Sequence, residues 1–209
     1  MNENGAVESI EVERKYEPHS DAVLPVAEAL AAFGFRMGEA ATHELRASYF
    51  DTPSLDLAAK KLALRYRIGG KDAGWHLKAK GDGSAHELLW PPSNEMPSGV
   101  FQEIKSQLGA GVAERLGTIA TLRTTRTTVM LFAESGEAVI EIADDRVDAT
   151  NEQNGVRQTW REWEAELVQY PADETLLDAL EPLLVAAGAT RVKDISKIQR
   201  TMSANGESA

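Results

Sequence analysis

"IEVERKY", residues 10–16, alternates apolar and charged side chains along a predicted strand. Because successive side chains of a strand point to opposite faces, Glu11, Glu13 and Lys15 share one face, and the apolar side chains share the other. A charged face of this kind is typical either of a strand exposed to water or of a strand that lines a charged interior. The other strands of the chain decide between the two.

Composition excludes several classes of function. We expect residues 1–209 to form one domain with a sizeable core and with loose ends at about 1–6 and 203–209. Acidic residues number 33 against 22 basic ones, and the net charge of −11 argues against general binding to nucleic acid or to an anionic membrane. No apolar run approaches the ~20 residues that span a bilayer, and the acidic N-terminus lacks the apolar core of a signal peptide. The chain has no cysteine, which fits a cytoplasmic location and excludes thiol chemistry.

Turn signals divide the chain into strands that are joined mainly as hairpins. Strands are expected at 10–16, 43–52, 62–69, 74–80, 85–90, 121–133, 137–147 and 157–169. Helices are expected at 20–34, 98–108 and 173–188, with shorter helical pieces within 54–61 and 192–202. Strands that dominate and follow one another as hairpins predict an antiparallel α+β protein, not a β-α-β fold.

Several later strands repeat the one-sided charge of the first. The pairs that share a face are Arg65/Arg67, Lys78/Lys80, Glu164/Glu166 and Glu141/Asp145. Outer faces of sheets usually mix the two signs, because like charges side by side repel. The opposite faces of these strands are apolar, and the predicted helices can cover them. We therefore predict a closed or nearly closed antiparallel β-barrel with a charged interior and with helices packed outside.

An interior of arginines, lysines and carboxylates suits a phosphate chain together with a divalent metal ion. Guanidinium groups match phosphate oxygens in pairs, and ammonium groups add point charges. Carboxylates alone repel such a ligand, but Mg²⁺ or Mn²⁺ binds carboxylate and phosphate oxygens together. The pattern thus predicts a basic wall and a metal-binding wall. The four histidines are scattered; His76 is expected either in the tunnel lining or in a surface or packed position.

The same residues resemble the CYTH domain family, the triphosphate tunnel metalloenzymes. The family's first strand carries Glu-x-Glu-x-Lys, and residues 11–15 match it. Similar blocks follow in order over nearly the whole chain: YFDT (49–52), LRYRIGG (64–70), WHLKAKG (75–81), RTTR (123–126), IEIADDRV (140–147), WREWEAEL (160–167) and SKIQR (196–200). The resemblance implies an antiparallel β tunnel of about eight strands that hydrolyses a triphosphate with Mg²⁺ or Mn²⁺.

The resemblance also implies roles for particular residues. The metal-side carboxylates are Glu11, Glu13, Glu164 and Glu166, with Asp145 or Asp144 as a further ligand. The phosphate ligands are Lys15, Arg65, Arg67, Lys78 and Arg126, joined by Lys197 over the tunnel mouth. The expected catalytic group is Glu11, Glu13, Lys15, Glu164 and Glu166. Glu87 matches an acid of the family, whereas Ala85 stands where the family often has arginine, and the role of Lys80 is left open.

The sequence leaves alternatives for substrate and activity. Inorganic triphosphate is the first expectation. The alternatives are thiamine triphosphate or a nucleoside triphosphate, or a non-catalytic module that binds polyphosphate. The carboxylate set argues against the last, and the His-Phe pair of the family's class IV adenylyl cyclases is missing. The closest blocks resemble bacterial proteins that fuse CYTH to a helical CHAD domain, so a CHAD domain in a longer parent chain is an expected partner.

Overall fold

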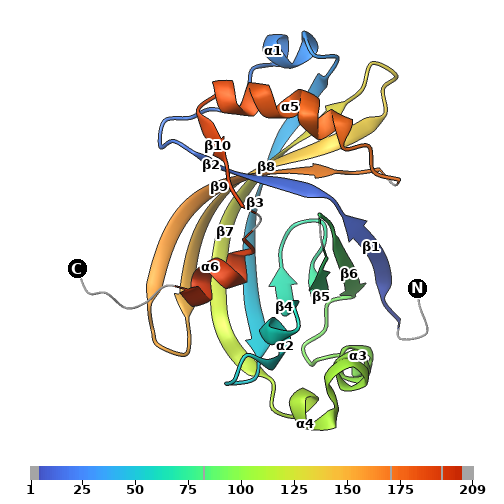
Figure 1. The fold of residues 1–209 in the computed structure, drawn as a ribbon, viewed down its shortest axis with the longest axis vertical. Coiled ribbons are helices and arrows are strands. Elements are labelled where there is room, and N and C mark those ends of the chain that lie inside the picture. The colour runs from blue at the N-terminus through green and yellow to red at the C-terminus, as the bar shows by residue number, and fades with distance from the viewer. Residues whose placement is uncertain (1–4, 82, 170, 194, 204–209) are drawn as a thin grey trace.

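A single antiparallel sheet organises the computed structural model, which describes residues 5–81, 83–169, 171–193 and 195–203 (Figure 1). The strands are β1 (Val7–Glu11), β2 (Glu13–Pro18), β3 (Arg36–Asp51), β4 (Leu62–Ile68), β5 (Gly74–Lys80), β6 (Ala85–Trp90), β7 (Gly117–Phe132), β8 (Ala138–Asn151), β9 (Arg157–Leu167) and β10 (Ala189–Arg191). The helices are α1 (Ala27–Ala31), α2 (Asp56–Ala59), α3 (Ser98–Leu108), α4 (Ala110–Ala113), α5 (Thr175–Ala186) and α6 (Lys197–Ser203).

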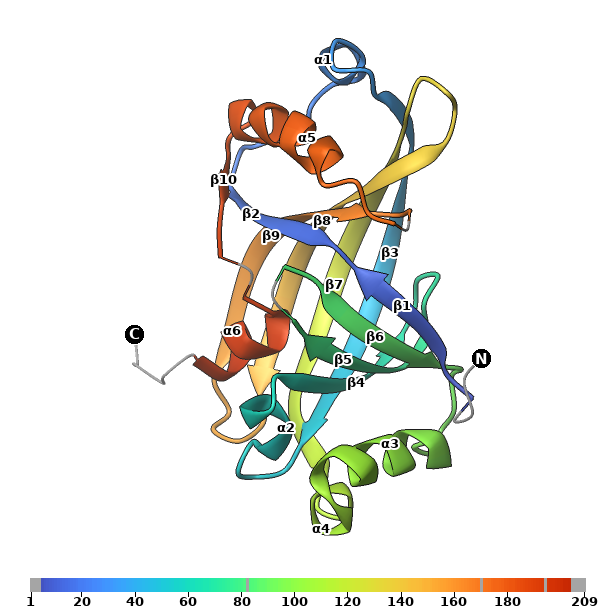
Figure 2. The ribbon, with the colours of Figure 1, turned by 45° about the vertical axis from the view of Figure 1, so that its right-hand side comes forward.

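The first two strands of the sequence connect one end of the sheet to a strand near its other end. The strand order is β1-β6-β5-β4-β3-β7-β8-β9-β2-β10, so β1 and β2 lie far apart in the order although only Val12 separates them in the chain. Figure 2 shows this segment passing from beside β6 to beside β9. The tunnel is therefore completed by the covalent chain rather than by a continuous ladder of hydrogen bonds. Glu11 and Glu13 stand on either side of this junction.

The predicted antiparallel α+β architecture with outer helices is confirmed, with ten strands in the described residues instead of about eight. Helix α3 has the predicted bounds, and β4, β5 and β6 match within one residue. The strand predicted at 10–16 is divided between β1 and β2, and β7 and β8 each extend four residues beyond their predicted bounds at one end. Two elements differ more strongly. The strand predicted at 43–52 already begins at Arg36, and the helix predicted at 20–34 is reduced to α1. Proline favours the start of a helix over its interior, and α1 begins after Pro25.

Two apolar clusters lie under the helices on the outer face of the sheet. Leu180 of α5 is buried with Trp163 of β9 in the first cluster. Ile104 of α3 is buried with Trp75 of β5 in the second. Figure 1 shows α1 and α5 at one end of the molecule and α3 and α4 at the other. The packed positions expected for Trp75 and Trp163 are thus confirmed, and burial of such side chains contributes roughly 1.5–3 kcal/mol each.

A third apolar cluster shows that the interior is charged along only part of its length. Leu122 of β7 and Val147 of β8 pack there against Ile198 and Met202 of α6. Leu122 lies four residues before Arg126 and Val147 lies two residues after Asp145, so both share the inward face of their strands and this cluster occupies the inner face. The prediction of a charged interior is therefore correct for the middle of the tunnel, whereas the part beside α6 is apolar.

The N-terminal segment also departs from the simple alternation. Ile10 is 44% exposed, so the apolar face of β1 is not covered as the pattern predicted, in keeping with its position as an end strand. Of the predicted loose ends, residues 1–4 and 204–209 lie outside the described residues, while Ala6 is buried and Ser203 ends α6. In the part of the chain that is described, no helix combines the length and the apolar character needed to cross a bilayer.

Asp51, from the YFDT block, fixes the turn into α2. Its carboxylate accepts hydrogen bonds from the backbone N–H groups of Thr52, Leu57 and Ala58 at 2.7, 2.9 and 3.0 Å. Replacement by alanine leaves these donors without their acceptor, so we expect Asp51→Ala to lower the free energy of unfolding by about 2–3 kcal/mol in urea denaturation. Asp51→Asn keeps one acceptor and should lose less. An unchanged free energy for Asp51→Ala would contradict this role.

Candidate active site

A cavity of about 440 Å³ inside the sheet collects the charged residues that the sequence singled out. The predicted site residues that line it are Glu11, Glu13, Lys15, Arg65, Arg67, Lys78, Arg126, Asp145, Glu164, Glu166 and Lys197, together with Glu87. The structure therefore brings the whole predicted set to one place. Asp144, the alternative to Asp145, lies on the opposite face and pairs with Arg161 at 2.7 Å.

Strand register turns the alternating pattern into facing ion pairs. Lys15 of β2 lies opposite Glu164 of β9, and its Nζ approaches the Glu164 carboxylate at 2.7 Å. Arg126 of β7 lies opposite Asp145 of β8 and donates two hydrogen bonds to it at 2.7 and 2.6 Å. Charge-assisted pairs of this kind hold both partners in fixed positions. The interior therefore has a defined arrangement of charges.

The basic wall is centred on Arg65 and Arg67 of β4. Burial, and then the neighbouring Arg65 and Arg126, lower the pKa of Arg67 to about 10. Among the described residues, the buried Nε atoms of Arg65 and Arg67 have no hydrogen-bond partner. Buried donors without partners cost about 1–3 kcal/mol each, so they need an explanation such as an absent ligand. The basic wall therefore has an excess of positive charge and unpartnered donors, and both are features of an anion-binding site.

Three carboxylates form a row across neighbouring strands. Glu166 of β9 lies opposite Glu13 of β2 on one side and opposite Glu141 of β8 on the other. Burial, and then repulsion led by Glu11, raise the pKa of Glu166 to about 8. Burial also raises the pKa of Glu11 to about 7, although Lys78 opposes this. Glu13, Glu141 and Glu166 are called the carboxylate row below. Lysines pair with its two outer members, Lys15 with Glu13 at 3.2 Å and Lys71 with Glu141 at 2.7 Å, whereas the central Glu166 has no ion pair among the described residues.

A second group of carboxylates is more compact. Buried oxygens of Asp145, Glu162 and Glu164 lie within 4.8 Å of one another, so this cluster could hold a metal ion. However, the Nζ of Lys197 from α6 lies 2.9, 2.5 and 2.8 Å from their carboxylates. Although burial opposes its ionisation, basic neighbours led by Lys15 hold the pKa of Glu164 well below its usual value. Lys15, Arg126 and Lys197 therefore compensate this cluster, whereas Glu166 of the carboxylate row has no ion-pair partner among the described residues.

Glu141, Glu162 and His76 were not in the predicted set, although each belongs to the site. Glu141 shares a face with Asp145 and lines the cavity, and Glu162 shares a face with Glu164 and pairs with Lys197 at 2.5 Å, so the period of two already contained the signal for both. The third is His76, which is 1% exposed and lines the cavity. Its Nδ1 lies 3.1 Å from Glu87, and its Nε2 lies 2.8 Å from the backbone carbonyl oxygen of Asp72. His76 was expected either in the tunnel lining or in a surface or packed position, and it is both packed and part of the lining.

The raised pKa of Glu166 predicts a pH-dependent stability. The folded-state pKa of about 8 exceeds the ordinary 4.5, so the folded protein keeps a proton that the unfolded chain releases. Stability should therefore fall as the pH rises through this interval, and Glu166→Gln removes that loss. In EDTA, we compare the Tm of Glu166→Gln with that of the wild type at about pH 5 and at about pH 8. We expect the Tm of the variant minus that of the wild type to be greater at the higher pH, by roughly 2–4 °C or more.

Calorimetry on a matched variant completes this test. Glu39 is exposed on β3, so Glu39→Gln should keep the same Tm difference from the wild type at both pH values. A Glu166→Gln difference that is equally independent of pH would show that Glu166 is not under charge repulsion in the folded protein.

Fold and site together define a class: an antiparallel β tunnel whose interior carries a basic wall opposite carboxylates. The CYTH domain family model matches residues 9–202. The chain belongs to the CYTH domain family.

Relatives and solved structures agree with this membership. Uncharacterized proteins from two strains of Mycobacterium tuberculosis, CDC 1551 and H37Rv, are 36% identical over 208 residues. The match covers 93% of this chain but only 40% of the length of those relatives.

Two solved structures share the fold. A candidate adenylyl cyclase of Hippeastrum, described as having a dominant triphosphatase activity, aligns with a TM-score of 0.58 at 20% identity over 94% of this chain and 96% of that one. A candidate adenylate cyclase of Bacillus halodurans aligns with a TM-score of 0.55 at 21% identity, covering 94% and 99% of the two chains.

Proposed function

We propose that the protein hydrolyses inorganic triphosphate inside its tunnel with Mg²⁺ or Mn²⁺ as cofactor. The observation that carries this proposal is the separation of charge within one cavity. On one wall, the buried Nε donors of Arg65 and Arg67 have no partner in the described part of the chain, while Glu13 and Glu166 face each other in the carboxylate row. Membership of the CYTH family and the triphosphatase activity ascribed to the Hippeastrum protein support a hydrolase of this kind.

The carboxylate row and the adjoining Glu11 fit a divalent metal ion. Carboxylate oxygens are ligands that Mg²⁺ and Mn²⁺ prefer. Burial is the main cause of the raised pKa values of Glu11 and Glu166, and repulsion from neighbouring carboxylates, which a bound cation would relieve, adds to it. When bound there by Glu11, Glu13 and Glu166, the ion would offset the charge of phosphate oxygens. Asp145 and Glu164, also predicted as ligands, belong to the cluster that Lys197 already neutralises.

The protein's own groups would bind and orient the substrate. Arg65, Arg67 and Arg126 converge on the cavity and can hold phosphoryl oxygens in a fixed line. Lys15 links the walls, because its Nζ lies 3.2 Å from Glu13 and 2.7 Å from Glu164. Phosphoryl transfer needs mainly positioning and charge stabilisation. The attacking water would form a bond to the terminal phosphorus and lose its proton to a carboxylate oxygen of the tunnel. The bond from that phosphorus to the bridging oxygen would break, and the basic wall would stabilise the negative charge on the pyrophosphate that leaves.

A phosphate-release assay tests the proposal and separates the alternatives. Triphosphate, thiamine triphosphate, ATP and long polyphosphate are each supplied with Mg²⁺, with Mn²⁺ and with EDTA. We expect triphosphate to be the fastest substrate, with release abolished by EDTA. Faster release from an organic triphosphate would favour the alternative hydrolase. Tight binding of polyphosphate without any release would favour a binding module.

The proposal concerns the tunnel alone. Because the match covers only 40% of the length of the Mycobacterium tuberculosis relatives, the activity and partners of a longer protein do not follow from it. The association with a CHAD domain and the cytoplasmic location stay predictions.

A further inference from the structure

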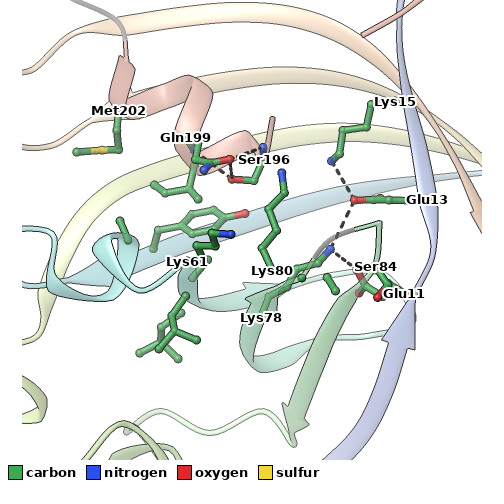
Figure 3. A pocket seen from close by; sticks show the side chains of 18 of the residues that line it. Glu11, Glu13, Lys15, Lys61, Lys78, Lys80, Ser84, Ser196, Gln199 and Met202 are labelled. Atoms are coloured by element: carbon green, nitrogen blue, oxygen red, sulfur yellow. Dashed lines mark hydrogen bonds and ion pairs between the residues drawn. The ribbon is translucent and has the colours of Figure 1, made fainter. Parts of the chain in front are cut away.

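A second cavity, of about 700 Å³, adjoins the tunnel and shares part of its wall. Glu11, Glu13 and Lys78 line both cavities, whereas Lys61 and Lys80 line only the second. Figure 3 shows Lys78 and Lys80 projecting into this space from the same strand, with Lys61 close to them. The basic lining therefore continues beyond the residues of the proposed triphosphate site. We call this second cavity the mouth cavity.

Lys61 and Lys80 are held side by side by the backbone. The N–H of Lys80, at the end of β5, donates to the carbonyl oxygen of Lys61, just before β4, at 3.0 Å. Lys78 lies two residues before Lys80 and therefore on the same face of β5. Like charges on neighbouring strands repel, and this repulsion is relieved when an anion lies between them. Lys78 already pairs with Glu11 and Glu13 in the tunnel.

The backbone beside the mouth cavity is also strained. Lys61 and Leu55 have φ values of 58° and 60°, and they are the two non-glycine residues with positive φ in the described part of the chain. Both line the mouth cavity, and they flank α2, whose start Asp51 holds. Such conformations cost roughly 1–3 kcal/mol each and cluster at ligand-binding positions. With this backbone conformation, the hydrogen bond from the N–H of Lys80 to the carbonyl oxygen of Lys61 holds the two residues side by side.

We propose that Lys61 and Lys80 form a subsite for the phosphoryl groups of linear phosphate chains longer than three. This inference rests on the proposed function, because the tunnel is taken to hold the first three phosphoryl groups. Each further group adds a negative charge at the point where the basic lining continues. The opposite side of the mouth cavity is apolar, with Ile119, Ile198 and Met202, and would suit an organic group instead. Two adjacent ammonium groups favour the phosphate chain, because they gain nothing from an uncharged group.

Turnover of two chain lengths tests the subsite. We measure kcat/KM for tripolyphosphate and tetrapolyphosphate with Lys61→Gln and Lys80→Gln, which keep most of the side-chain length but remove the charge. We expect the ratio of tetrapolyphosphate to tripolyphosphate to fall about tenfold, the size of one charge-assisted hydrogen bond. Lys60→Gln is the matched control, because Lys60 is exposed and does not line the mouth cavity. An equal loss for both substrates, or no loss, would overturn the subsite.

Binding measurements keep the test independent of catalysis. Isothermal titration of tripolyphosphate and tetrapolyphosphate in EDTA should show tighter binding of the longer chain by the wild type, and loss of this advantage in both lysine variants. If no phosphate chain is hydrolysed, the proposed function fails, but this comparison still decides the subsite. Equal affinity for the two chains in the wild type would overturn it. So would a preference for thiamine triphosphate over tetrapolyphosphate that Met202→Ala removes.

Discussion

Glu13→Gln is expected to reduce metal-dependent release of phosphate from triphosphate by about 10³-fold, a loss of roughly 4 kcal/mol in transition-state stabilisation. Glu13 faces Glu166 across the β2–β9 ladder and also lies 3.2 Å from the Nζ of Lys15. Glutamine keeps the size of the side chain but removes the charge that would hold the metal ion. Steady-state kinetics at saturating Mn²⁺ give the rate, and circular dichroism shows whether the fold is kept.

A control on the same strand makes this result specific. Glu17 is exposed and pairs with Arg200 at 2.7 Å on the surface, so Glu17→Gln should keep its activity within about twofold. If Glu13→Gln retained wild-type turnover with an intact fold, Glu13 would have no part in metal binding.

Arg65→Ala is expected to lower kcat/KM for triphosphate by about 10²–10³-fold, with a fall in kcat as well as a rise in KM. Its guanidinium lies 3.5 Å from Glu87, and its Nε has no partner among the described residues, which leaves it able to donate to a phosphoryl oxygen. Interactions that strengthen as charge develops on the transferred group affect kcat, and so the split between the two constants is informative.

Two further variants sharpen the test of Arg65. Arg65→Lys keeps the charge but loses the fork of donors, so it should recover only part of the activity. Arg46→Ala removes an exposed arginine of the neighbouring strand β3 and should leave both constants unchanged. An Arg65→Ala enzyme that changes KM alone would show that Arg65 binds substrate and transition state equally.

Sequence alternation was sufficient to predict which side chains face inward. Arg65 and Arg67 share the interior because side chains two residues apart in a strand must share a face, and the same holds for Glu164 and Glu166. The apolar faces of these strands likewise predicted outer helices, and Trp163 is buried beneath α5. These predictions depend only on local backbone geometry, which the sequence specifies directly.

Register between strands could not be predicted in the same way. The carboxylate row exists because Glu13, Glu166 and Glu141 come level on three neighbouring strands. That alignment depends on loop lengths and on packing across the whole sheet. It cannot be predicted from the sequence of any single strand. For the same reason, Glu141 and Glu162 were left out of the predicted set, although both lie on the correct face. The break at Val12, which divides the first strand between two neighbours, is also a property of the whole sheet.

The position of α6 also depends on tertiary contacts and could not be predicted from the sequence. Lys197 was expected at the tunnel mouth as a phosphate ligand, and the structure places its Nζ against Asp145, Glu162 and Glu164. A buried ammonium needs such compensation, because an unpaired charge in the interior is costly. The sequence shows a lysine in a basic tail but not which carboxylates it will meet.

The proposed activity requires one arrangement of the tunnel, in which one wall binds phosphoryl oxygens directly and the other binds them through a divalent ion. A crystal structure with tripolyphosphate and Mn²⁺, with the metal located by its anomalous scattering, tests this most directly. We predict Mn²⁺ at Glu13 and Glu166, with tripolyphosphate between the metal and Arg65 and Arg67. Mn²⁺ bound elsewhere, or tripolyphosphate bound outside the tunnel, would contradict the account.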